Sequence, residues 1–386
     1  MSKANLIQLD TTDVDRWRGV PLGGGQLKEP VHINDIRRWA QGMQNPNRLY
    51  FDDRYAAESV HGELIAPQSF TICTDVGHGA TPAIQGNIPG QHMLFGGDEW
   101  WCFGPRIRPG DFIRQDRMLF DYKVTETKFA GPTMFSRGDT TYINQHGQVV
   151  AKQRSTSIRY IAENARKMGL FANSKEKEWT DAELEAVEKE KLEYYQTFLE
   201  LGHQRRLFVK VGDKLPRRPI GPHTLLTFTT EWRSYTMTVW GAAYDYGRSS
   251  TQESGWTPEM SRDPEGSKVD PANADGLYKG PSRGHAQPRW ARHIGMPRGY
   301  GYGATMGAWI LDYLTNWGGE HCFVEHSDMK YRFPALTGDL TYLDGEVTNL
   351  TYADTGNPVA HVKVSMTTQD GALMAGGDAQ IRLPVG

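Results

Sequence analysis

The stretch that decides the fold is Arg108-Pro109-Gly110-Asp111, followed after a strand-like segment by Asn144-Gln145-His146-Gly147-Gln148-Val149-Val150-Ala151. The pattern recurs as Leu336-Thr337-Gly338-Asp339 and then Thr368-Gln369-Asp370-Gly371-Ala372-Leu373-Met374-Ala375. Gly147 follows Gly110 by 37 residues and Gly371 follows Gly338 by 33, so the two intervals nearly match. Alternating apolar and polar residues in both intervals indicate half-buried strands, and each Gln-x-Gly indicates a hairpin turn. The chain therefore predicts two copies of one antiparallel strand pattern.

A helix candidate precedes each of these β regions. The first spans residues 66–75, and Pro67 suits a first helical turn because its missing N–H costs nothing there. The second, Gly303–Leu314, is apolar nearly all round and is therefore expected to be buried on most sides. Outer helices are expected at Ile33–Gln44 and Leu225–Trp240. This order predicts an α+β fold in which each half is an antiparallel sheet wrapped round a central helix.

The segment between the two halves differs in character. Thr180-Asp181-Ala182-Glu183 is typical of a helix N-cap, and a loose apolar stripe follows it among many charged residues. We therefore expect an N-terminal domain over residues 1–160, a helical linker over 161–206 and a C-terminal domain over 207–386.

Composition narrows the function. The 43 Lys and Arg balance 46 Asp and Glu, which disfavours a basic nucleic-acid-binding face. The three cysteines form no CxxC pair, so neither a disulfide framework nor a cysteine zinc site is expected. No apolar run reaches about 18 residues, and the start MSKANLIQLD does not resemble a signal peptide. A cytoplasmic enzyme or binding protein with no membrane span is expected.

Several further stretches carry a family resemblance through their order and spacing: Asn45-Pro46-Asn47-Arg48-Leu49-Tyr50-Phe51-Asp52 leading to Ala66-Pro67, Arg106 to Asp111, Tyr331-Arg332-Phe333-Pro334 before Gly338-Asp339, and His285-Ala286-Gln287-Pro288-Arg289-Trp290-Ala291. In these the chain resembles the MaoC-like dehydratases, the (R)-specific enoyl-CoA hydratase family, in its tandem double hotdog form. The resemblance covers almost the whole chain. It implies a lyase that adds water to, or removes it from, the 2,3 bond of an enoyl-CoA thioester.

The resemblance also implies site residues. The family uses an Asp and a His five residues later, ahead of a Tyr/Trp-Ala pair, together with a backbone N–H at the start of the central helix. Counting back from Ala56 places Asn45 and Tyr50 at these positions, so the first half is expected to be non-catalytic. Counting back from Ala291 places His285 at the histidine position but Gly280 at the acid position.

The expected catalytic set follows from this count. His285 is the general base or acid, and the N–H of Gly303 is the donor to the thioester oxygen. A carboxylate from the insertion Ser249–Gly284 is needed in place of Gly280, with Asp275 as the first candidate. On its own, His285 between Gly284 and Ala286 is more typical of a surface loop, and the Pro-x-Trp-Ala that follows is what supports a site role.

Substrate-binding residues are expected in two places. Tyr50 and Asp52 would line the acyl tunnel as remnants of the first motif, with structural packing as the alternative. Arg298, Tyr300 and Tyr302 lie in the glycine-rich stretch Gly295–Gly303, where the backbone permits close approach of a ligand. For Arg298 the alternative is an exposed loop arginine.

Two other functions remain open. A hotdog thioesterase would need a carboxylate on or near the central helix, and Asp75 and Asp312 occupy similar offsets along the two helix candidates. A catalytically degenerate acyl-thioester binder would explain the substitutions at Asn45, Tyr50 and Gly280. Under each alternative the partner is an acyl-CoA and a homo-oligomer is expected. No metal or redox cofactor is expected, and coenzyme A enters as part of the substrate.

Overall fold

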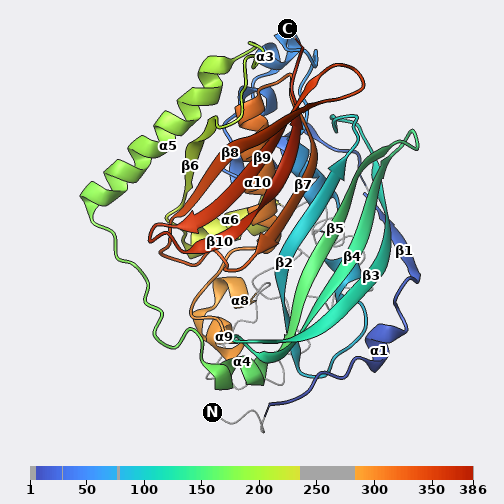
Figure 1. Ribbon diagram of the computed structural model, residues 1–386, viewed down its shortest axis with the longest axis vertical. Helices are drawn as coiled ribbons and strands as arrows, with labels where there is room; N and C mark the ends of the chain where they lie inside the picture. Colours follow the sequence, from blue (N-terminus) through green and yellow to red (C-terminus); the bar gives the residue numbers. More distant parts are fainter. Residues whose placement is uncertain (1–5, 28, 76–78, 235–282, 386) are drawn as a thin grey trace.

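The structure is a computed structural model that describes residues 6–27, 29–75, 79–234 and 283–385. Its strands form one ten-stranded sheet in the order β1-β3-β4-β5-β2-β7-β10-β9-β8-β6, with antiparallel neighbours throughout (Figure 1). The strands are β1 (Pro21–Gln26), β2 (Gln91–Cys102), β3 (Ile113–Thr127), β4 (Gly131–Asn144), β5 (Val149–Ile161), β6 (Lys214–Ile220), β7 (Phe323–Tyr331), β8 (Thr341–Tyr352), β9 (Pro358–Thr368) and β10 (Leu373–Arg382).

The strand order repeats itself, as the sequence predicted. Counting inward from each edge, the first half runs β1, β3, β4, β5, β2 and the second runs β6, β8, β9, β10, β7. β2 and β7 lie side by side in the middle, paired from Gly97↔Lys330 to Trp101↔His326 (Figure 1). The predicted hairpin turns are confirmed between β4 and β5 and between β9 and β10, where Gly147 and Gly371 have φ of 76° and 78°.

Helices pack against this sheet or flank it. They are α1 (Thr12–Asp15), α2 (Ile33–Gly42), η2 (Arg48–Tyr50), α3 (Asp53–Glu58), η3 (Gln68–Thr74), η4 (Thr81–Ile84), α4 (Ala162–Met168), α5 (Asp181–Leu201), α6 (Leu225–Ser234), α8 (Arg283–Ala286), α9 (Pro288–His293) and α10 (Gly303–Gly318). The outer helices expected at Ile33–Gln44 and Leu225–Trp240 correspond to α2 and α6. The part of the second beyond residue 234 lies outside the described residues.

The two predicted central helices differ. α10 is buried from Ala304 to Gly318 and packs against η3, as its all-round apolar sequence predicted. η3 is a short 3-10 helix where a longer helix was expected. The hydroxyls of Thr71 and Thr74 donate to the carbonyls three residues back, Gln68 and Thr71, at 3.2 and 2.8 Å. β-Branched residues that bond their own backbone weaken an α-helix, which accounts for the tighter, shorter turn.

The linker segment contains α4 and α5. Thr180 is the N-cap of α5, as the sequence indicated, and its side chain and that of Glu183 form a reciprocal capping box. α5 runs along the outer edge of the sheet beside β6 (Figure 1). The domain boundaries at 160 and 206 stay a prediction. None of the helices in the described residues is both long and apolar enough to cross a bilayer.

Candidate functional site

His285 is held in one tautomer by a backbone hydrogen bond. Its Nδ1 lies 2.6 Å from the carbonyl oxygen of Tyr300. A carbonyl can only accept, so the ring proton is on Nδ1 and Nε2 carries the lone pair whenever the ring is neutral. The ring stacks on Tyr302 at 3.8 Å between centroids and contacts Tyr300 at 4.3 Å. The structure thus brings together three of the predicted site residues.

The electrostatics favour a neutral imidazole. Burial lowers the pKa of His285 to about 4, and the hydrogen bond to Tyr300 offsets this only in part. The ring is therefore uncharged near neutral pH, with Nε2 able to accept a proton.

Gly303 is the first residue of α10, as predicted, and it is tightly packed. A Cβ at this position would lie 2.3 Å from the Cβ of Phe95 on β2, so a side chain cannot be accommodated without a shift. No backbone carbonyl within the described ranges accepts a hydrogen bond from the amide of Gly303 or of Ala304. The start of α10 therefore offers N–H donors and the positive end of a helix dipole.

Arg298 has a structural role in this geometry. It is buried, and its guanidinium donates to the Thr337 carbonyl at 2.6 Å, to Ser174 Oγ at 2.8 Å and to Asp339 Oδ1 at 2.9 Å. These bonds tie the turn before α10 to the turn before β8, and they do not support a ligand contact. Asp275, the predicted acid, and Gly280 lie outside the described residues.

The first-half motif residues are part of the packing. Asp52 is the N-cap of α3: it accepts a hydrogen bond from the Tyr55 amide at 3.0 Å and pairs with Arg48 at 2.9 Å on the surface. These contacts give Asp52 a capping role at the start of α3. Tyr50 is buried beside Arg106, and burial raises its pKa to about 12. Both residues have packing or capping contacts, and their role in lining an acyl tunnel stays a prediction.

The thioesterase candidates are also enclosed. Asp312 is buried in mid-helix, where Ser69 Oγ donates to it at 2.6 Å and burial raises its pKa to about 6. Asp75 is buried in an ion pair with Arg117 and accepts from the Gly79 amide at 3.0 Å. Asp312 lies nine positions after Gly303 along α10, about 13 Å of rise. Asp312 therefore lies far along α10 from the helix start.

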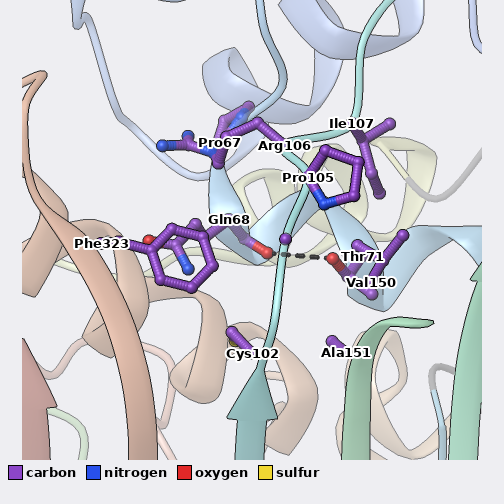
Figure 2. Close-up of a pocket in the computed structure, with 11 residues that line it drawn as sticks. Pro67, Gln68, Thr71, Cys102, Pro105, Arg106, Ile107, Val150, Ala151 and Phe323 are labelled. Carbon is purple, nitrogen blue, oxygen red and sulfur yellow. Dashed lines mark hydrogen bonds between the residues drawn. The ribbon is translucent and has the colours of Figure 1, made fainter. Parts of the chain in front are cut away.

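A pocket lies at the corresponding position of the first half. It is small and partly open to solvent. Figure 2 shows Pro67 and Arg106 at the top of this pocket, Gln68 and Thr71 of η3 below them, and Phe323 of β7 beside Gln68. Phe323 of β7 lies beside this pocket, and Phe95 of β2, at the equivalent place in the other half, lies beside Gly303. The pocket therefore belongs to the half that has Asn45 and Tyr50 in place of the motif acid and histidine.

Two residues near the second-half site have no signal in the sequence. His92 on β2 places Nε2 3.4 Å from the hydroxyl of Tyr300, and burial lowers its pKa to about 3. Glu231 on α6 is fully buried near the first turn of α10. Only the register of β2 brings His92 to this position, and a lone glutamate in a helix normally indicates a solvated face.

Two comparisons of sequence match parts of this chain to known proteins. Residues 16–153 match the family model described as FAS1-like, dehydratase domain region. A probable enoyl-CoA hydratase alpha subunit from Thermomonospora curvata is 24% identical over 246 residues, which cover 60% of this chain and 74% of that protein.

Solved structures share the fold at low sequence identity. A MaoC-like dehydratase superposes with a TM-score of 0.57 at 14% identity, covering 94% of this chain and 98% of its own. A putative MaoC domain dehydratase from Chloroflexus aurantiacus gives 0.54 at 12% identity, covering 94% and 95%. A Mycobacterium tuberculosis protein described as having a double hotdog fold gives 0.51 at 11% identity, covering 96% and 97%. The resemblance to MaoC-like dehydratases is thereby confirmed.

Proposed function

We propose that this chain is a tandem double hotdog enzyme that hydrates enoyl-CoA thioesters, or dehydrates 3-hydroxyacyl-CoA, at the start of α10. The observation that carries the proposal is the 2.6 Å hydrogen bond from His285 Nδ1 to the Tyr300 carbonyl, which leaves Nε2 as a base. The similarity to MaoC-like dehydratases and to a probable enoyl-CoA hydratase subunit supports the same reaction class.

In the hydration direction, the amides at the start of α10 would hold the thioester oxygen. Donors fixed in place stabilise the negative charge that develops on this oxygen as the double bond is attacked. The helix dipole adds to this, because its positive end lies at Gly303. The carbonyl is thereby polarised, and C3 becomes electrophilic.

His285 would act on the water. Its Nε2 takes a proton while the water oxygen forms a bond to C3, and a proton then adds to C2. The Tyr300 carbonyl performs the orienting role that a carboxylate would otherwise have, since it fixes the tautomer through Nδ1. The stack on Tyr302 holds the plane of the ring. A base of low pKa is a weaker proton acceptor but is never lost to protonation near neutral pH.

The test is hydration of a panel of enoyl-CoA thioesters of increasing chain length, followed through the loss of the conjugated double bond. His285→Ala and His285→Gln should each lower kcat by roughly 100-fold or more, the range expected for a lost general base. His293→Ala is the matched control, because His293 is a neighbouring histidine that stacks on Trp290 at 4.9 Å. Wild-type turnover that survives in both His285 variants would refute the assignment of the base.

A further inference from the structure

Glu231 is an acidic side chain on the buried face of α6. Phe228, Glu231 and Ser234 recur every three residues and are all buried, at 1%, 0% and 2% exposure. Phe228 packs against Gly301, just before α10, and Ser234 packs against Gly42 of α2. These buried residues thus face the segment that leads into α10. Glu231 interacts with the Thr305 hydroxyl in the first turn of that helix.

The carboxyl of Glu231 is poorly satisfied. Neither of its oxygens has a hydrogen-bond partner of normal geometry, and among the described residues only the Thr305 hydroxyl interacts with it. Other buried acids near α10 are better bound. Asp98 accepts from Trp100 Nε1 at 2.8 Å and from the Tyr331 hydroxyl at 2.7 Å, and Asp339 accepts from Arg298.

A buried carboxyl without partners is unfavourable for folding, so it requires an explanation. Burial raises the pKa of Glu231 well above its ordinary value, which favours the neutral, protonated form of the carboxyl. A neutral carboxylic acid has one O–H to donate. Groups of this kind concentrate at functional sites.

Glu231 and His285 both lie near the first turn of α10. α6 packs on α8, which carries His285, and a Cβ on Gly299 would lie 2.7 Å from Leu225 of α6 and 2.8 Å from the His285 carbonyl. The amide of Thr305 donates to the Tyr302 carbonyl at 3.1 Å, and the ring of Tyr302 stacks on that of His285. The two side chains therefore meet the first turn of α10 through Thr305 and Tyr302.

We propose that Glu231 is the acid of this site and delivers the proton to C2 of the acyl thioester. It would take the place of the carboxylate that is missing five residues before His285, where this chain has Gly280. The assignment rests on the proposed hydration. As the water oxygen bonds to C3, His285 Nε2 takes one proton from that water. The electron pair of the double bond moves to C2 and is quenched by the proton of Glu231. The imidazolium and carboxylate that remain return to neutral by proton transfer from the first to the second, so charge and atoms balance.

The experiment compares Glu231→Gln and Glu231→Met with the wild type. Both variants keep the size of the side chain and remove its acidic proton. We expect kcat for enoyl-CoA hydration to fall roughly 100-fold or more. The dissociation constant of a saturated acyl-CoA should stay within about threefold, and the thermal midpoint should be equal to or above that of the wild type. A difference infrared spectrum between wild type and Glu231→Gln at neutral pH should show the band of one protonated carboxyl.

Glu320→Gln is the matched control. Glu320 is a second buried glutamate, beyond the opposite end of α10, and it accepts hydrogen bonds from His203 Nδ1 at 2.7 Å and from the Val60 amide at 3.3 Å. Its variant should keep kcat. The inference is overturned if Glu231→Gln keeps kcat within about threefold, if binding and stability fall together with kcat in both Glu231 variants, or if the carboxyl band is missing. A wild type inactive on every enoyl-CoA would instead overturn the proposed function, and this role with it.

Discussion

At the scale of single residues, the site depends on how His285 is held. Its position was predictable, because the aligned Pro-x-Trp-Ala segment and the start of the next helix are local patterns. The partner of its Nδ1 was not, since a backbone carbonyl fifteen residues away has no sequence signature. Asp52 and Arg298 show the converse: their residue types suit a ligand, but their hydrogen bonds are all to the protein. Glu231 was missed because its burial depends on which helix covers α6.

The pKa of His285 predicts the acid side of the pH profile. Its value of about 4 means that the ring loses its base function only below that pH. A plot of kcat/KM against pH should therefore be level from about pH 5 to 7 and should fall below about 4. Initial rates of enoyl-CoA hydration across this range provide the measurement. A fall that begins near pH 6.5, the ordinary value for histidine, would show that the ring is not desolvated as the structure has it.

At the scale of elements, the capped helices and the hairpin turns followed from short-range patterns. The capping box of α5 and the turns at Gly147 and Gly371 lie where the sequence indicated. The 3-10 form of η3 was not foreseen, because pairs of Thr hydroxyls and β-branched side chains shift the balance between helix types by small amounts. Short-range sequence patterns therefore predicted the ends of the elements better than they predicted the type of helix.

The contact between α10 and β2 gives an element-scale prediction. Replacing glycine by alanine in a helix normally stabilises it by up to about 1 kcal/mol. Gly303→Ala should instead destabilise this protein by roughly 1–3 kcal/mol, because the new Cβ meets the Cβ of Phe95 at 2.3 Å. Phe95→Ala opens space, so Gly303→Ala should cost less in that background. Urea unfolding of the four proteins measures the coupling. If the losses of unfolding free energy in the two single variants simply add in the double variant, α10 and β2 are not in steric contact at these residues.

At the scale of the whole molecule, the duplication was visible as two matched intervals. The pairing of β2 with β7, which joins the halves into one sheet, was not visible, since a repeat does not specify how its copies meet. The long-range contacts that hold α10 in place were likewise not visible in the sequence. His223 shows this: its ring stacks on Trp309 at 5.3 Å, and its Nε2 lies 2.8 Å from Thr341 Oγ1 on β8.

His223 predicts how global stability responds to acid. Burial lowers its pKa to about 3 in the folded protein, against about 6.5 when unfolded. Between these values the unfolded chain binds a proton that the folded chain does not, so the stability present above pH 6.5 is lost as pH falls. The unfolding free energy of the wild type relative to His223→Gln should therefore decrease by up to about 1.4 kcal/mol per pH unit below 6.5. Urea titrations of both proteins at pH 7.5 and 5 measure this, and a constant difference would contradict the assigned environment.

The central claim is that water is added to the acyl chain while the thioester stays intact. It is tested most directly by incubating the protein with an enoyl-CoA in water enriched in oxygen-18 and analysing the products by mass spectrometry. The account predicts one heavy oxygen on C3 of an intact 3-hydroxyacyl-CoA, formed by the wild type and nearly absent with His285→Ala. Heavy oxygen in a free carboxylic acid beside released coenzyme A would show a thioesterase, and unlabelled enoyl-CoA throughout would show a binder.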